Sequence, residues 1–251
     1  MIIHDSHVHI GQFRELYSSP EGVFDFLDKL GVSRMAASST GTCEGNPDVP
    51  IRELRRLIKV AGNRVTPVLW MNPEWMIDGS VDKLLSCGID WKCVKVHGYF
   101  SKWEDKPEVL QQTVNLAKRL KVPMLFHTGG RPESDAGVYL PVAKSNPEVT
   151  FILAHSRPVD QTIKVMEECS NVMADTAFTP EEDVESMIKK GFANRILWGT
   201  DYPLHNVFYE GEDIVANLND RITAFKKMMT VEEWEMVSHT NYERVFGEMN
   251  G

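Results

Sequence analysis

The residues with the clearest chemical potential are histidines and aspartates that recur along the whole chain. The first group reads Asp5-Ser6-His7-Val8-His9, and single histidines follow much later, each near the end of a short apolar run. Imidazole nitrogens and carboxylate oxygens are the usual protein ligands of ions such as Zn²⁺. These residue types therefore indicate metal-assisted chemistry, provided that the fold brings them together.

Eight short apolar runs contain or precede these residues and predict β-strands. The runs are nearly all apolar, as expected of strands that are covered on both faces. The predicted strands are Ile2–His9, Met35–Thr40, Val65–Asn72, Cys93–Gly98, Pro123–Gly129, Thr150–Ser156, Val172–Ala177 and Ile196–Tyr202. Amphipathic segments with helix start and stop signals lie between them. The clearest predicted helices run from Pro20 to Gly31, Pro50–Ala61, Pro107–Leu120, Pro158–Cys169 and from Pro180 to Gly191.

Regular alternation of strands and helices predicts a parallel sheet with right-handed crossovers. Eight such units in 251 residues match the size of a closed (β/α)8 barrel. An open doubly wound sheet would instead have a Gly-rich phosphate loop after its first strand, and His7-Val8-His9-Ile10-Gly11 is not such a loop. Two more helices are expected, at Asp213–Met229 and Val231–Phe246, the second with a capping box. We therefore expect an α/β fold: a TIM barrel over residues 1–251, forming one domain with extra C-terminal helices.

The C-terminal ends of the strands meet on one face of such a barrel, which is where active sites of this fold lie. Six of the predicted strands bear reactive side chains there: Asp5, His7, His9, Lys95, His97, His127, His155, Asp175 and Asp201. Side chains alternate across a strand, so His7 and His9 share a face with Asp5. Two imidazoles about 6–7 Å apart on that face can reach one ion. The pattern predicts a metal site at this end of the barrel.

Bulk composition narrows the class of partner. The formal net charge is −9 without a dense basic run, which disfavours nucleic acid. The four cysteines form no CxxC pair and are interpreted as reduced. Neither a leader-like start nor an apolar run of about 20 residues is present, so no membrane association is expected and the cytoplasm is predicted. A small-molecule substrate is the expected partner, and a homo-oligomer stays open.

The motifs resemble the amidohydrolase superfamily, and within it the amidohydrolase-related branch that includes the aminocarboxymuconate-semialdehyde decarboxylases. The matching segments are D-x-H-x-H, V-K-V-H, H-T-G, A-H-S, G-T-D-Y-P and N-Y-E-R-V-F-G, in family order along nearly the whole chain. The resemblance implies metal ligation by His7, His9, His127 and Asp201. It also implies that His155 lies beside the metal as a catalytic or substrate-polarising group.

Two departures affect the predicted number of ions. The usual ending of the sixth strand is His-x-Gly-Gly, whereas Arg157-Pro158 stands here. Lys95 occupies the place where other branches carry a carboxylated lysine that bridges two metals. The lysine of this branch is usually unmodified, so one ion is favoured over two. Lys95, His97 and His155 are accordingly candidates for a second metal or for substrate.

The predicted ligand set, three imidazoles and one carboxylate, leaves positions open for water and substrate. Zn²⁺ fits these ligands best, and Mn²⁺ is an alternative. Such an ion lowers the pKa of bound water from 15.7 to roughly 7. Asp201 is the expected proton acceptor, and His155 is expected to polarise the substrate carbonyl.

Several side chains are candidates for holding the substrate. Arg131 and Arg157 follow the fifth and sixth strands, where they could pair with a substrate carboxylate. His205 follows the eighth strand and is a candidate for the mouth of the site. The aromatic residues Trp70, Tyr99 and Trp103 could form a wall.

The predicted function is hydrolysis of a small carbonyl substrate, an amide, ester or lactone. The alternative is a metal-dependent non-oxidative decarboxylase of a carboxylate-bearing substrate, which would release carbon dioxide. A TatD-like nuclease is less favoured, because it would have a carboxylate where the fourth strand offers Lys95 and His97. A non-catalytic binding barrel should have lost a ligand, and none is missing.

Overall fold

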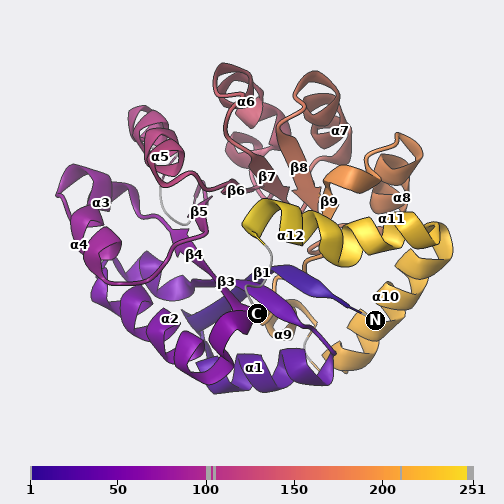
Figure 1. The fold of residues 1–251 in the computed structure, drawn as a ribbon, viewed down its shortest axis with the longest axis horizontal. Coiled ribbons are helices and arrows are strands. Elements are labelled where there is room, and N and C mark those ends of the chain that lie inside the picture. The colour runs from indigo at the N-terminus through magenta and orange to yellow at the C-terminus, as the bar shows by residue number, and fades with distance from the viewer. Residues whose placement is uncertain (1, 100–102, 104–105, 210, 248–251) are drawn as a thin grey trace.

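The computed structural model describes residues 2–99, 103, 106–209 and 211–247. Its strands form one sheet in the order β2-β1-β3-β4-β5-β6-β7-β8-β9, in which every pair except β1–β2 is parallel. The strands are β1 (His4–Phe13), β2 (Leu16–Ser18), β3 (Arg34–Ser39), β4 (Val65–Trp70), β5 (Cys93–Val96), β6 (Met124–His127), β7 (Phe151–Ala154), β8 (Val172–Asp175) and β9 (Ile196–Leu197). Figure 1 shows them curling around a centre with the helices outside.

The parallel strands close into a ring, because the segment after β9 bonds back to β1. The amide of Ser6 donates to the Trp198 carbonyl (2.9 Å), the Asp201 amide to the His7 carbonyl (2.8 Å) and the His9 amide to the Tyr202 carbonyl (2.7 Å). The predicted (β/α)8 barrel is therefore confirmed. The predicted eighth strand, Ile196–Tyr202, was too long as a regular strand: β9 ends at Leu197, and the rest runs irregularly along β1.

Helices follow most strands and cover the outside of the barrel. They are α1 (Pro20–Lys29), α2 (Asp48–Ala61), α3 (Pro73–Ile77), α4 (Val81–Ser86), α5 (Pro107–Leu120), α6 (Leu140–Ser145), α7 (Val159–Glu168), α8 (Glu181–Lys189), α9 (His205–Phe208), α10 (Ile214–Met228), α11 (Val231–Glu235) and α12 (Asn241–Phe246). The predicted capping box of Thr230 and Glu233 is present. A π-helical turn, Met236–Thr240, joins α11 to α12 within the predicted last helix. Within the described residues, no helix is both long and apolar enough to cross a membrane.

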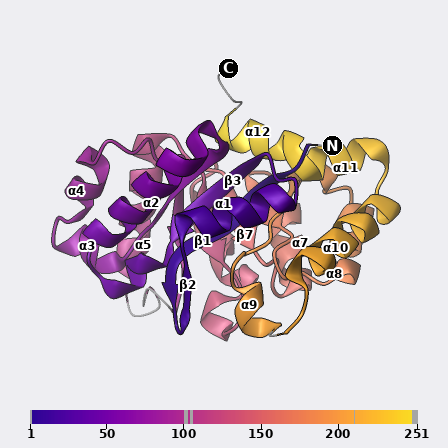
Figure 2. The same ribbon diagram turned by 90° about the horizontal axis from the view of Figure 1, so that it is seen from below.

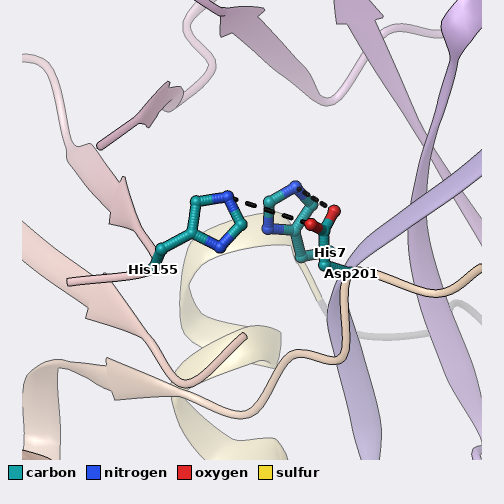
Figure 3. Close-up of side chains that lie close together, drawn as sticks. All are labelled: His7, His155 and Asp201. Carbon is teal, nitrogen blue, oxygen red and sulfur yellow. Dashed lines mark ion pairs between the residues drawn. The ribbon is translucent and has the colours of Figure 1, made fainter. Parts of the chain in front are cut away.

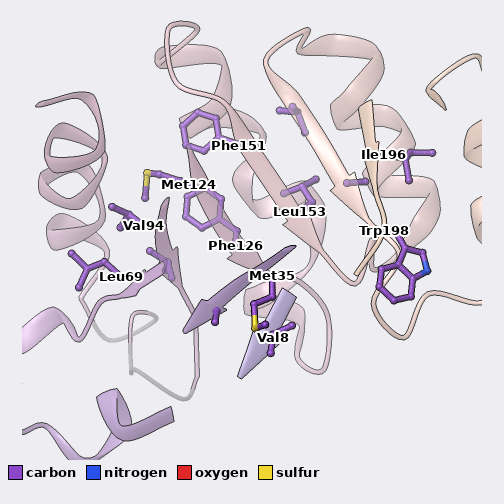
Figure 4. Close-up of a cluster of buried hydrophobic side chains, with 14 of the residues drawn as sticks. Val8, Met35, Leu69, Val94, Met124, Phe126, Phe151, Leu153, Ile196 and Trp198 are labelled. Atoms are coloured by element: carbon purple, nitrogen blue, oxygen red, sulfur yellow. The ribbon is translucent and has the colours of Figure 1, made fainter. Parts of the chain in front are cut away.

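The core has two layers because side chains alternate along each strand. Between strands and helices lie residues such as Met124, Phe126 and Leu153 (Figure 4). Inside the barrel lies a smaller cluster, made of Ala36, Val68, Cys93, Leu125, Ile152, Ala154, Met173, Leu197, Tyr242 and Phe246. Apolar side chains thus fill much of the interior.

Helix α12 closes the end of the barrel at which the strands begin. It contributes Tyr242 and Phe246 to the interior cluster, and the Tyr242 hydroxyl donates to Thr66 Oγ1 at 2.6 Å. These contacts give the N-Y-E-R-V-F-G segment a packing role. Figure 2 shows α12 at one end of the molecule, and β2 and α9 at the opposite end. The strand ends that carry the predicted site residues lie at the end opposite α12.

Candidate metal centre and active site

Three predicted ligands meet where β1 runs beside the segment after β9. The Nε2 atoms of His7 and His9 lie 3.2 Å and 3.0 Å from Asp201 Oδ1. Lys95 enters the same cluster from β5, with its Nζ 2.7 Å from His7 Nε2 and 3.0 Å from His9 Nε2. All four side chains are buried. Two imidazoles, a carboxylate and an amine thus share one small, buried volume.

His155 reaches this cluster from the end of β7. Its Nε2 lies 3.9 Å from Asp201 Oδ2, and donor atoms of His7, His155 and Asp201 all lie within 4.8 Å of one another (Figure 3). His127 lies at the end of β6, the strand next to β7, and its Nδ1 lies 3.1 Å from His155 Nε2. The geometry groups His155 with the predicted ligands, while His127 contacts the group through His155.

The hydrogen-bond partners of the Nδ1 atoms determine which nitrogen carries the proton in His155 and in His7. His155 Nδ1 lies 3.0 Å from the Ala177 carbonyl oxygen, which can only accept, so Nδ1 carries the proton. His7 Nδ1 likewise faces Asp175 Oδ2 at 2.9 Å. The Nε2 atom of each neutral ring then presents a lone pair, as metal ligation requires.

Burial keeps the imidazoles of this group neutral. Desolvation, followed by the charge of Lys95, lowers the pKa of His7 and holds the pKa of His9 well below its usual range. Desolvation also depresses the pKa values of His127 and His155. The same effect lowers the pKa of Lys95 to about 8. Neutral imidazoles are the form that binds metal ions.

Asp175, at the end of β8, forms hydrogen bonds that orient both His7 and His155. Its Oδ2 accepts from His7 Nδ1, and its Oδ1 accepts from the backbone amides of His155 (2.8 Å) and Ala177 (3.0 Å). One carboxylate therefore fixes both the His7 ring and the backbone that carries His155. On β3, Ser38 Oγ lies 2.9 Å from His9 Nδ1 and has the corresponding position for that ring.

Asp5 supports the site without joining the cluster. The β1–β3 register shifts between Asp5 and Val8, which interrupts the strict alternation expected from the sequence. The Asp5 carboxylate accepts from the Thr200 amide (3.1 Å), the Thr200 hydroxyl (2.7 Å) and the His7 amide (3.0 Å). The shared face predicted for Asp5 with His7 and His9 was thus wrong. Asp5 instead ties β1 to the segment that carries Asp201.

Backbone strain concentrates at this end of the barrel. His155, Ser156 and Asp201 have φ angles of 69°, 52° and 59°, in the left-handed region that most L-residues avoid. Each such residue costs on the order of 1–3 kcal/mol and persists where the surroundings enforce it. Strain at both His155 and Asp201 is typical of a functional site.

The donor set fits a divalent transition-metal ion. Asp201 Oδ1 is buried and accepts no hydrogen bond, yet two imidazole nitrogens lie within 3.2 Å of it. Lys95 Nζ contacts both imidazole nitrogens but leaves Asp201 Oδ1 without a hydrogen bond, and a cation bound at this oxygen would supply the missing partner. Imidazole nitrogens and a carboxylate oxygen are the ligands that Zn²⁺ accepts, and His155 Nε2 adds a further nitrogen.

A cavity of about 340 Å³ opens over the cluster. Its lining residues are His9, Phe13, Thr40, Trp70, Lys95, His97, Tyr99, His127, Gly130, His155, Arg157, Phe178, Asp201, Leu204, Phe208 and Tyr209. Sequence reasoning missed the aromatic side chains of the late loops, because a loop phenylalanine carries no positional signal. Ser38 could have been found, since alternation along Met35–Thr40 puts it on one face with Ala36 and Thr40.

The other predicted substrate-binding residues lie at different distances from the cavity. Arg157 lines it, and its Nη2 donates to the Phe178 carbonyl at 2.9 Å. Arg131 is exposed, with its guanidinium 4.7 Å from the centre of the Tyr99 ring, outside the lining. His205 is buried behind Phe178, with their ring centres 4.3 Å apart. Burial lowers the pKa of His205 to about 4.

The predicted aromatic wall is present in part. Trp70 and His97 lie in parallel with ring centres 5.5 Å apart, and His97 lies on His127 at 3.7 Å. Trp70 and Tyr99 line the cavity. Trp103 instead packs in the outer core, and its Nε1 donates to the Met71 carbonyl at 3.3 Å.

Replacing Asp175 by Asn is expected to lower metal affinity roughly 10- to 100-fold while the barrel still folds. If the amide oxygen stays on the two backbone N–H groups, the amide NH₂ faces His7 Nδ1 and moves the ring proton to Nε2. The lone pair needed for the metal is then lost. Zinc titration of the purified variant measures the change, with Asp160→Asn, at an exposed position of α7, as the matched control. Unchanged zinc affinity would contradict the role of Asp175.

The family model described as Amidohydrolase (Amidohydro_2) matches residues 5–247. No curated protein sequence matches the chain. Similar solved structures include one described as a probable 2-pyrone-4,6-dicarboxylic acid hydrolase from Acinetobacter baumannii, with TM-score 0.69 and 14% identity over 99% of this chain and 100% of that chain.

Two further structures extend the likeness. An amidohydrolase with bound zinc from Burkholderia multivorans has TM-score 0.69 and 11% identity, covering 99% of this chain and 100% of its own. A TatD homologue from Escherichia coli K12 has TM-score 0.70 and 15% identity, covering 98% of both chains. At these identities the structures show a shared fold. The family match spans nearly the whole sequence, and the chain therefore belongs to the amidohydrolase family.

Proposed function

We propose that this protein is a metal-dependent hydrolase that attacks a small carbonyl substrate, an amide, ester or lactone, with an activated water molecule. The observation that carries the proposal is the convergence of His7 Nε2 and His9 Nε2 on Asp201 Oδ1, which is buried and accepts no hydrogen bond. The zinc in the Burkholderia multivorans structure supports Zn²⁺ as the ion. One ion, held by His7, His9, Asp201 and His127, remains the predicted arrangement.

The bound ion would supply Lewis acidity, which activates water and polarises the substrate carbonyl. Asp201 has the position of the proton acceptor. Its Oδ1 faces the proposed ligands, while its Oδ2 is directed toward His155 at 3.9 Å. Among the described residues that line the cavity, it is the only acid. Asp201 can therefore take the proton from water and pass it to the leaving group.

The role of His155 is narrower than the one expected from the sequence. Because Nδ1 donates to the Ala177 carbonyl, the neutral ring presents its Nε2 lone pair to His127 Nδ1 at 3.1 Å, with Asp201 Oδ2 further away at 3.9 Å. A lone pair can bind a cation or accept a proton, whereas stabilising an oxyanion requires a hydrogen-bond donor. We infer that His155 acts first as a proton acceptor or ligand, and polarises the substrate only after it has gained a proton.

Lys95 separates the one-metal from the two-metal form of the proposal. An unmodified lysine contributes a positive charge for substrate, so Lys95→Ala should leave one ion bound and raise the Michaelis constant. A carboxylated lysine bridges two ions, and the same substitution should then lower the metal content from two to one. We expect the first result. Metal analysis of both proteins, with Lys92→Ala, at a half-buried position outside the cavity, as a control, distinguishes them. Rescue by small carboxylates would contradict an unmodified lysine.

Removing the metal is the direct test of the proposed function. Hydrolysis of a panel of amides, esters and lactones should stop after chelation and return on addition of Zn²⁺ or Mn²⁺. Product analysis then separates the two reaction classes, because decarboxylation releases carbon dioxide and consumes no water. Release of carbon dioxide from carboxylate-bearing members of the panel, without hydrolysis of the others, would favour the decarboxylase. Activity that survives complete removal of metal would overturn the proposal.

A further inference from the structure

The cavity over the cluster has aromatic side chains on two sides. On the side of β4 and β5, Trp70 lies parallel to His97, with an angle of 11° between their rings. The Tyr99 ring meets His97 edge-on, with ring centres 4.8 Å apart and an angle of 88°. Trp70 and His97 thus lie parallel, with Tyr99 perpendicular to His97, beside the proposed metal ligands.

The loops after β8 and β9 supply the second group, centred on Phe178. The Tyr209 ring lies nearly parallel to Phe178 at 6.0 Å, and the Phe208 ring meets it edge-on at 5.7 Å. The His205 ring supports Phe178 from behind at 4.3 Å. Phe208 and Tyr209 are 59% and 42% exposed, although both line the cavity. Aromatic area of this kind is retained at a surface where it contacts a ligand or partner.

Phe178 also occupies an unfavourable backbone conformation. Its φ angle is 52°, a region that Gly and Asn tolerate and that aromatic residues avoid. The Arg157 side chain donates to its carbonyl at 2.9 Å and so holds the loop in this shape. A strained residue whose ring lines a cavity indicates that the ring itself is used there.

The cavity lining contains few charged side chains. Lys95 and Arg157 are basic, and Asp201 is the only acid among the described lining residues. Most other lining side chains are aromatic, aliphatic or imidazole groups. The hydrocarbon side chains of Phe13, Phe178, Leu204 and Phe208 offer no hydrogen-bond partner to the hydroxyl groups of a polyhydroxylated substrate. An anionic group, in contrast, finds a guanidinium able to pair with it.

On the basis of the proposed function, we infer that the substrate carries a flat, conjugated ring and one anionic group, with the ring against Phe178 and the anion beside Arg157. A volume of about 340 Å³ suits a molecule with a single ring and short substituents. Flat rings pack in offset-stacked or edge-to-face contacts with aromatic side chains, which saturated rings cannot copy. Phe178 is thus a specificity-determining residue.

Binding of three matched probes to the zinc-loaded protein tests the inference. Benzoate has a flat ring and a charge, cyclohexanecarboxylate has the charge alone, and benzamide has the ring alone. Calorimetry should find that benzoate binds roughly 3- to 10-fold more tightly than cyclohexanecarboxylate, the range given by one or two aromatic contacts. It should also bind about 10-fold more tightly than benzamide, because a charge-assisted contact is lost in the amide.

Two variants assign these preferences to residues. Phe178→Asn removes the ring and suits the left-handed backbone, so the preference for benzoate over cyclohexanecarboxylate should vanish while the melting temperature holds or rises. Phe24→Leu, on α1 outside the cavity, is the matched control. Arg157→Met should abolish the preference for benzoate over benzamide.

Equal binding of benzoate and cyclohexanecarboxylate by the parent, or a ratio that survives Phe178→Asn, would overturn the inference. A charge preference that survives Arg157→Met would assign the anion to another cation and contradict its placement. These readouts are binding ratios that need no turnover. Failure of metal-dependent hydrolysis would therefore overturn the proposed function and leave the ring preference in place.

Discussion

Asp201→Asn is expected to lower kcat by roughly 10²- to 10⁴-fold, the usual range for losing a general base. Asn keeps the size and one oxygen of the side chain, so it can still ligate weakly, but it cannot accept a proton. Metal content should therefore fall far less than turnover. Steady-state kinetics under saturating zinc, together with metal analysis of the same sample, measures the two effects separately.

Few other groups near Asp201 could take its place as the general base. No other acidic residue is among the described residues that line the cavity, and Asp175 is occupied by three hydrogen bonds. His155 Nε2 is the other proton acceptor within reach, at 3.9 Å from Asp201 Oδ2. Parental activity in the variant would show that Asp201 is not the base and would transfer that role to His155. Asp160→Asn again serves as the control for a lost surface charge.

The sequence predicted the barrel because its signals are local and repeated. Strands buried on both faces lack polar residues, and helix start signals such as Thr230 and Glu233 depend on neighbours in the chain. The irregular parts depend on distant pairing. The register shift between Asp5 and Val8 forms where β1 pairs with β3, and β9 shortens because the segment after it bonds to β1.

The candidate site also combines residues that sequence signals reveal with residues whose positions depend on distant contacts. Strand ends identified His7, His9, His155 and Asp201, because the fold alone brings such ends together. Phe178 was missed because its position depends on a loop conformation held by Arg157. The number of hydrogen bonds to Asp175 could not be predicted either, since two of them come from the backbone amides of His155 and Ala177.

His7→Ala and His9→Ala are each expected to lower bound metal by an order of magnitude or more. Both remove an Nε2 atom from the group around Asp201 Oδ1, and water cannot replace a ligand fixed on a strand. Metal analysis after equilibrium dialysis against buffered zinc measures the loss. His239→Ala, on the C-terminal π-helical turn, controls for loss of a histidine elsewhere. Full metal retention in both variants would remove the central claim.

The two variants should differ in the stability of the metal-free protein, which separates ligation from packing. His7→Ala leaves Asp175 Oδ2 buried without its partner, at a cost of about 1–3 kcal/mol. Each substitution also removes one partner of Lys95 Nζ. His9→Ala otherwise frees only the Ser38 hydroxyl, which can rotate toward another acceptor, so its cost should be smaller. Denaturant unfolding without metal measures both. Equal metal loss with unequal stability would identify the two histidines as ligands of one ion with different supports. Metal loss that merely followed stability would instead mean that the substitutions act through the fold.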